Sequence, residues 1–141
     1  TTTDSGAVKQ ISFILANVLG GEPVDFTPPN AGAATGLAAA GSPNKVVIKY
    51  IDSDQTVSDL YWTAVPLGTD NGNNLLEANE KFLITIGSTT AGAGAGNLID
   101  ALTTDLQTNK KFTLELLTPA GAILQIERTT PPFLSLKNNL R

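Results

Sequence analysis

The sequence predicts an all-β domain folded as an antiparallel β-sandwich of about seven strands. In residues 111–130, two runs of alternating apolar and polar residues flank the turn sequence Thr118-Pro119-Ala120-Gly121. Similar strand-like runs, separated by turns rich in Gly, Asn, Asp and Pro, recur along the rest of the chain. The length of 141 residues corresponds to one domain, which buries about 70% of its extended-chain surface without needing disulfides.

The expected strands begin with an ambiguous segment and end with the hairpin. Residues 7–19 contain the Ala and Leu of a helix, but Ile11, Phe13 and Leu15 alternate with other residues, and their β-branched and aromatic character favours a strand. The strands are expected, in order, at residues 7–19, 22–26, 45–51, 58–65, 81–86, 112–117 and 122–128.

The hairpin at residues 111–130 has a defined inner face. Side chains alternate across a strand, so Phe112, Leu114 and Leu116 are expected on one face of the first strand. Pro119 presets the backbone angle of a turn residue, and Gly121 can adopt a positive φ without steric cost. The following prolines, 131 and 132, are expected to end the second strand.

One short helical segment is expected within residues 97–109, because Leu98, Leu102 and Leu106 recur every four residues. Residues 1–6 are polar and are interpreted as a linker. Residues 7–141 are interpreted as the β-sandwich domain. Seven short strands with frequent turns are typical of an immunoglobulin-like antiparallel sandwich.

The absence of Cys, His and Met argues against an enzyme. It removes Ser-His and Cys-His nucleophile systems and the zinc, haem and iron–sulfur sites that depend on these ligands. Carboxylates, amides and hydroxyls remain, and these oxygen groups suit hard cations. We therefore expect no catalytic residues and no organic cofactor.

The charge pattern argues against a nucleic-acid partner. The formal net charge is −4, and the nine basic residues are scattered instead of forming a basic face. No apolar run approaches the roughly 18 residues of a membrane span. Charged residues make up only 16% of the chain, against about 25% in ordinary domains. This deficit favours a surface covered by other subunits or by glycans, with a stable monomer that has a charge-poor surface as the alternative.

Two oxygen-rich loops are candidate metal sites. Asp70, Asn71 and Asn73 lie around Gly72, so their side-chain oxygens could bind a calcium ion or a similar hard divalent cation. Asp52 and Asp54 are alternative ligands in another loop. Neither loop has the ligand spacing of an EF-hand, and Asn71-Gly72 is by itself a strong signal for a tight turn. A plain turn therefore stays open as the alternative at both places.

Several segments together resemble the outer domain of archaellin, the archaeal flagellin. They are residues 20–27 (GGEPVDFT), residues 45–52, residues 79–82 (NEKF) and the hairpin continuing to residue 131. The resemblance extends over roughly residues 7–140. It implies a structural subunit of the archaellum, the archaeal motility filament, located outside the cell.

The same resemblance implies how such a subunit assembles. In archaellins an apolar N-terminal helix packs in the filament core, and a β-sandwich faces outward. This chain opens with polar residues, so we expect the outer domain without its helix, which self-assembles into a helical filament only when that helix is present. Some archaellins hold a metal ion in the outer domain, which adds weight to calcium near Asp70, Asn71 and Asn73.

Two further expectations concern glycans and an alternative role. No Asn lies in an Asn-X-Ser/Thr sequence, so N-linked sugar is not expected, whereas an O-linked glycan stays open. The alternative function is an accessory archaellum component or a surface-layer adhesion module that uses an immunoglobulin-like fold to bind one partner. A single stoichiometric partner would distinguish it from a self-assembling subunit.

Overall fold

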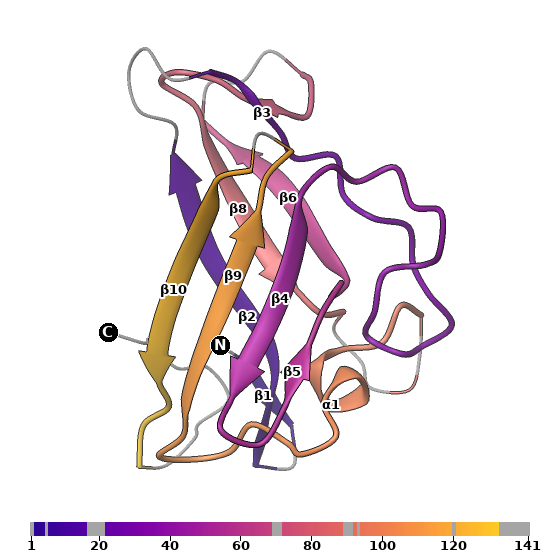
Figure 1. Cartoon of the computed structure of the whole chain (residues 1–141), viewed down its shortest axis with the longest axis vertical. Helices are drawn as coiled ribbons and strands as arrows, with labels where there is room; N and C mark the ends of the chain where they lie inside the picture. The colour runs from indigo at the N-terminus through magenta and orange to yellow at the C-terminus, as the bar shows by residue number, and fades with distance from the viewer. Residues whose placement is uncertain are drawn as a thin grey trace.

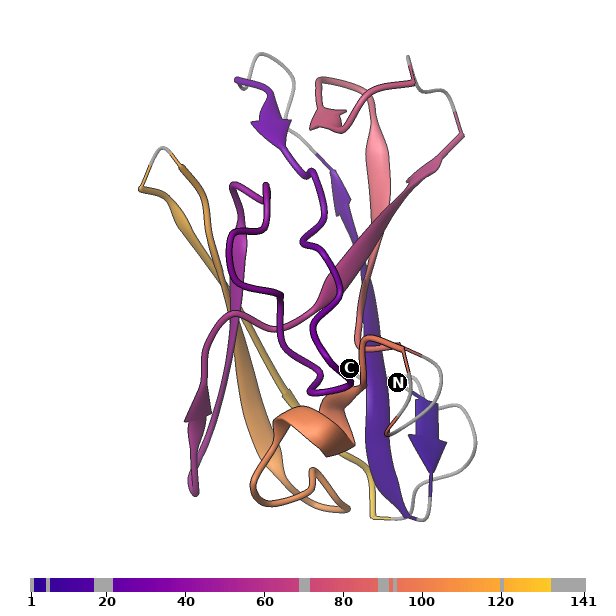
Figure 2. The ribbon, with the colours of Figure 1, turned by 90° about the vertical axis from the view of Figure 1, so that its right-hand side faces the viewer.

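Two four-stranded antiparallel sheets pack face to face to form the molecule (Figures 1 and 2). The computed structural model describes residues 2–4, 6–16, 22–68, 72–88, 92, 94–119 and 121–132. Within this part of the chain every paired strand is antiparallel. The expectation of an all-β antiparallel sandwich is confirmed.

The strand order of each sheet follows from long-range pairing. The first sheet has the order β1-β2-β8-β6, formed by Thr2–Asp4, Ala7–Ala16, Lys81–Ile86 and Trp62–Leu67. The second has the order β10-β9-β4-β5, formed by Ile123–Thr129, Lys111–Leu117, Val47–Asp52 and Thr56–Val57. A small third sheet joins β3, Val24–Asp25, to β7, Leu75–Leu76.

Each of the seven predicted segments contains a strand, but three further strands were not predicted. These are β1, β5 and β7, which are two or three residues long and too short to show a periodic pattern. β1 lies within the segment interpreted as a linker and pairs with the first half of β2. Residues 58–65 were expected to be strand throughout, but β6 begins only at Trp62, because Asp59 adopts a positive φ of 61°.

The hairpin has the turn that its sequence indicates. Gly121 has a φ of +87°, and its amide donates to the Thr118 carbonyl at 3.0 Å. Phe112, Leu114 and Leu116 are all buried, as their alternation predicts. The second strand, β10, lies at the edge of its sheet and is largely exposed.

The predicted helical segment is present but much shorter than residues 97–109. The helix α1 covers Leu98–Ala101, and a capping box opens it: Asn97 accepts from the Ile99 amide, and Asp100 accepts from the Asn97 amide. Leu102 is already extended and ends the helix. The four-residue spacing of leucines reflects burial, since Leu98, Leu102 and Leu106 all reach the core, but beyond residue 101 they do so from a loop.

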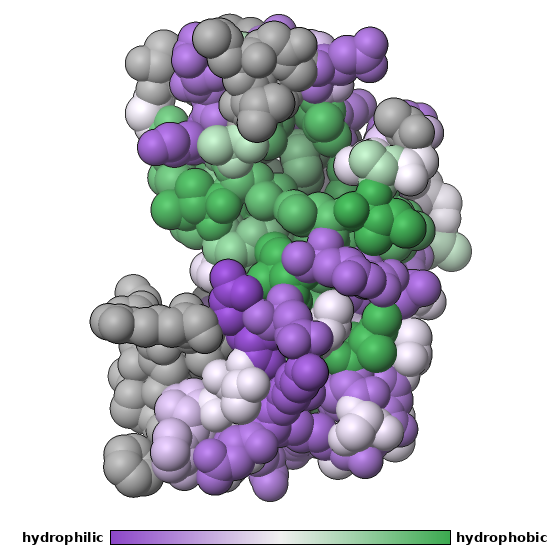
Figure 3. Space-filling view, turned by 60° about the vertical axis from the view of Figure 1, so that its left-hand side comes forward, coloured by the Kyte–Doolittle hydropathy of each residue, from purple (hydrophilic) through white to green (hydrophobic). Residues whose placement is uncertain are grey.

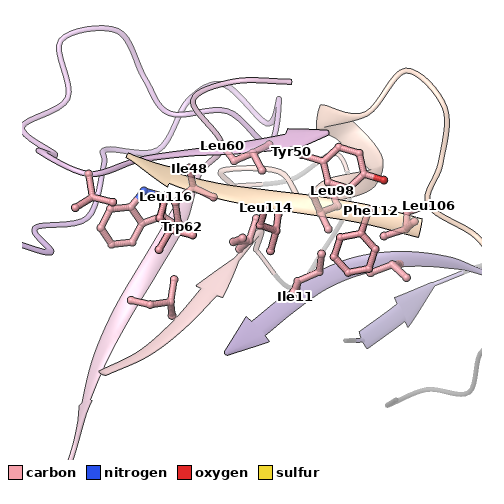
Figure 4. Close-up of a cluster of buried hydrophobic side chains, with 14 of the residues drawn as sticks. Ile11, Ile48, Tyr50, Leu60, Trp62, Leu98, Leu106, Phe112, Leu114 and Leu116 are labelled. Atoms are coloured by element: carbon pink, nitrogen blue, oxygen red, sulfur yellow. The ribbon is translucent and has the colours of Figure 1, made fainter. Parts of the chain in front are cut away.

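The core lies between the two sheets (Figure 4). Phe26 packs edge-on against both Trp62 and Phe82, with ring centroids 6.1 Å apart in each pair. Tyr50 stacks on Phe112 at 6.0 Å. Among the described residues, no helix is long and apolar enough to cross a membrane.

Candidate functional surfaces

The first predicted metal loop is described only in part. Asp70 and Asn71 lie outside the described residues. Asn73 is exposed, and its side-chain oxygen accepts from the Leu75 amide at 2.8 Å, immediately before β7. This bond is the local side-chain turn that Asn favours, and it uses part of the oxygen's capacity. A calcium ion at Asp70, Asn71 and Asn73 stays a prediction.

The second predicted loop is a hydrogen-bonded corner at the end of β4. One oxygen of Asp52 accepts from the amides of Asp54 and Gln55, at 2.7 and 3.1 Å. Its other oxygen accepts from the Tyr50 hydroxyl at 2.7 Å. The Lys110 ammonium lies 3.8 Å from Asp52 and contacts the Asp54 carboxylate directly. A cation at Asp52 and Asp54 would compete with this lysine, and it too stays a prediction.

Charge and burial shift the pKa values of this corner in opposite directions. Burial alone would raise the pKa of Asp52, but the hydrogen bonds from Tyr50, Asp54 and Gln55 and the charge of Lys110 together lower it. Burial and the neighbouring carboxylate raise the pKa of Tyr50, while the hydrogen bond to Asp54 raises that of Lys110. At neutral pH the Asp52 carboxylate and the Lys110 ammonium are therefore both charged, whereas the Tyr50 hydroxyl is neutral.

Gln55 connects this corner to the loop after α1. Its amide nitrogen donates to the Thr104 carbonyl at 2.6 Å, and its oxygen accepts from the Thr103 amide at 2.8 Å. The polar groups of the corner are thus used to hold loops together. Within the described ranges, no group of three or more Asp, Glu, His or Cys side chains is placed to hold a metal ion.

Exposed apolar side chains form a row on the outer face of each sheet. On the first sheet, Ile14 pairs with Leu83, and Leu83 pairs with Val65 on its other side. We call these three residues the first apolar row; Ile14 is 59% and Val65 51% exposed. On the second sheet, Val47, Leu117 and Ile123 are paired in the same way and form the second apolar row.

A groove lies between the two sheets at the open edge of the sandwich. β1 covers only the first half of β2, and farther along the β2 and β10 edges face each other across an apolar groove of about 150 Å³. Leu15, Leu116 and Leu124 are among its lining residues. Figure 3, which brings this edge forward, shows an apolar band between hydrophilic surfaces. Exposed apolar patches on a protein surface mark interaction sites.

The sequence by itself does not identify these rows as a surface. A signal was present, since Ile14, Val65 and Ile123 are apolar residues at positions that alternate with the buried face of each strand. Strand alternation places such residues on the outside. Whether these side chains lie next to one another depends on the register of the paired strands, which the sequence alone does not specify.

Comparison with known proteins gives one informative match. No protein-family profile matches the chain. Over 132 residues, or 93% of the chain, it is 32% identical to "Probable flagellin 2" of Archaeoglobus fulgidus. The matched region spans 56% of that relative, so the chain corresponds to a little over half of the longer protein. This match confirms the resemblance inferred from the sequence: the chain is archaellin-like over nearly its whole length.

Proposed function

We propose that this chain is the outward-facing β-sandwich of a structural subunit of the archaellum, and that it acts outside the cell without catalysing a reaction. The observation that carries the proposal is the 32% identity to a probable flagellin over 93% of the chain. The polar side chains of the Asp52 corner also support it, because they bond to one another and to neighbouring loops. The apolar rows supply surface for neighbouring subunits.

Immunogold electron microscopy of the source cells tests this proposal. Antibodies raised against the 141-residue chain are expected to label cell-surface filaments along their whole length. Label restricted to the cell envelope, or to the filament base, would contradict a filament subunit and favour the alternative of an accessory or adhesion module. A strain lacking the gene serves as the control and should lose both the label and swimming motility.

Assembly of the whole protein is part of the same proposal. The part of the relative outside the match leaves room for the apolar helix that the archaellin resemblance implies. In our proposal that helix forms the filament core, and the sandwich adds contacts between subunits at the surface. Intact-mass measurement of filament protein would also detect O-linked sugar, which stays a prediction.

A stabilising calcium ion near Asp70, Asn71 and Asn73 is a separate proposal. Its support is the oxygen-rich composition of the loop and the exposed position of Asn73. Titration calorimetry of chelator-treated protein with Ca²⁺ should give heat of binding, and the variant Asn73→Ala should weaken it. Absence of heat, together with an unchanged melting temperature, would identify the loop as a plain turn.

A further inference from the structure

We propose that the first apolar row of one copy packs against the second apolar row of the next copy, so that successive domains stack through two different faces. This inference rests on the proposed filament function and names the surfaces through which the sandwich contacts its neighbour. The occupant of each row is a second copy of this chain.

The two rows are built alike, which makes them suitable partners. Each crosses three adjacent strands of a four-stranded sheet and consists of aliphatic side chains on the outer face. The outer positions Ile14, Val65 and Ile123 are 59%, 51% and 58% exposed, so each row has apolar area left to bury. Sheets pack face to face through such side chains, as the two sheets already do inside this molecule.

The polar residues beside the rows are compatible with this packing. Next to the first row, β8 presents Lys81 on the same outer face. Next to the second row lies a ladder in which Glu115 accepts from Gln125 at 3.0 Å and lies 3.9 Å from Lys49. Stacking can therefore place Lys81 near the Glu115 carboxylate, and neither row contains a charge that the contact would bury.

Charge complementarity argues against the simpler alternative, pairing of two β10 edges about a twofold axis. An antiparallel β10 pair of this kind, centred on Ile126, would place Leu124 opposite Arg128 and Ile123 opposite Thr129 of its partner. The apolar Leu124 would then face a charged side chain and Ile123 a polar one, and charge on an edge strand is a common way to block edge pairing. A contact between two different faces avoids this mismatch.

A contact between two different faces has a structural consequence. Because each copy keeps one unused row after the first contact, further copies can add without limit unless the rotation closes a ring. Such contacts generate helical filaments. Each contact is small, so we expect weak binding between isolated domains, with Kd on the order of 1 mM, and stable contact only where many subunits are held together.

Two single variants test the arrangement. Val65→Glu blocks the first row and Ile123→Glu blocks the second, and both additions are negative, so the altered faces repel each other. Each ¹⁵N-labelled variant alone should give NMR spectra independent of concentration up to about 1 mM. In an equimolar mixture, V65E should show shifts at its intact second row and I123E at its intact first row. Sedimentation of the mixture should stop at dimers, whereas the unchanged chain forms larger species.

Two control variants place the same charge on the same two outer faces but outside the apolar rows. Ser12→Glu and Thr129→Glu add the same charge to exposed positions on the outer faces outside the rows, and both should associate as the unchanged chain does. Three results would each overturn the inference: no self-association of the unchanged chain at about 1 mM, association of either row variant alone, or no association in the mixture. Filament labelling by the antibody would still support the proposed function in each of these cases.

Discussion

At the scale of single residues, the Asp52 corner shows how a charged group can organise loops. The Asp52 carboxylate accepts four hydrogen bonds, from the Tyr50 hydroxyl, the Asp54 amide, and the backbone and side-chain amides of Gln55, and it lies near the Lys110 ammonium. All these bonds favour the ionised form. The folded corner therefore depends on a charge that acid removes.

Asp52→Asn tests this dependence through pH. The pKa of Asp52 is lower in the folded chain, so its contribution to stability is complete above the unfolded value of about 3.9 and is lost as the pH falls through the folded value. At pH 7 the variant should lose about 1–2 kcal/mol of unfolding free energy, as expected for hydrogen bonds to a charged group. Urea unfolding should show this difference shrinking between pH 5 and about pH 2.

Asp54→Asn is the matched control, because the Asp54 side chain is 50% exposed and contacts the same lysine. It should cost about 0.5 kcal/mol or less. If the loss of unfolding free energy in Asp52→Asn stayed constant from neutral to acid pH, the charge of Asp52 would not be the source of its contribution to stability.

At the scale of elements, the loop that contains Gly36 is in backbone contact with the loop that precedes α1. The Gly36 amide donates to the Ala95 carbonyl at 2.9 Å, and the Ala34 amide donates to the Gly94 carbonyl at 3.1 Å. Gly96 has a φ of +78°, and a Cβ there would lie 2.3 Å from the Gly36 nitrogen. Glycine is required at this position by both conformation and space.

Gly96→Ala should therefore lower the unfolding free energy by about 3 kcal/mol or more, because backbone atoms cannot move aside as a flexible side chain would. Gly41→Ala is the control: its φ of +75° is similar, but nothing lies within 4 Å of the added Cβ. It should cost about 1 kcal/mol, the cost of the left-handed conformation alone. Equal losses for both variants, measured by urea unfolding, would contradict the close contact.

The two faces of β9 give a second prediction at this scale. Leu114 is fully buried between the sheets, whereas Leu117 lies on the outer face in the second apolar row. Leu114→Ala should cost about 2–5 kcal/mol, and Leu117→Ala less than about 1 kcal/mol. Thermal unfolding measures the stability loss of each variant. A similar loss for both would mean that side chains on the outer face contribute to stability as much as those in the core.

Sequence alone was sufficient for the strongly periodic elements and insufficient where tertiary structure decides. The hairpin could be predicted because its alternation and its Pro-Gly turn are local properties. The two-residue strands β5 and β7 could not, because they exist only through their partners. The spacing of Leu102 and Leu106 suggested a helix, but both side chains are buried from a loop that runs along the core.

The same distinction applies to the candidate sites. Asp52 and Asp54 were recognised as an oxygen-rich cluster, but their neighbour Lys110 is 56 residues from Asp54 along the chain. The apolar rows depend on the register of three strands each, which local sequence does not specify.

At the scale of the whole molecule, exposed apolar side chains lie on the outer faces of both sheets, and Figure 3 shows an apolar band on the side that it brings forward. Because the side chains of the two apolar rows are not part of the core cluster, charge added at Val65 and Ile123 should leave folding intact. The low fraction of charged residues in the chain agrees with a proposed role in which these apolar side chains contact other subunits.

The double variant carrying Val65→Glu and Ile123→Glu tests this separation. We expect its unfolding free energy to stay within about 0.5 kcal/mol of the unchanged chain, as is usual for surface substitutions. Its solubility should increase, measured as the protein remaining in solution at rising ammonium sulfate. A loss above about 2 kcal/mol would show that the rows support the fold itself.

Trp62 gives these experiments an internal optical probe. It is the only tryptophan of the chain and is completely buried beside Phe26. Its indole fluorescence should shift to longer wavelength when the sheets separate and water reaches the ring. Since the apolar rows lie on the outer faces, docking of another copy should leave that emission unchanged. In one sample, the emission wavelength of Trp62 therefore reports unfolding, and sedimentation reports association.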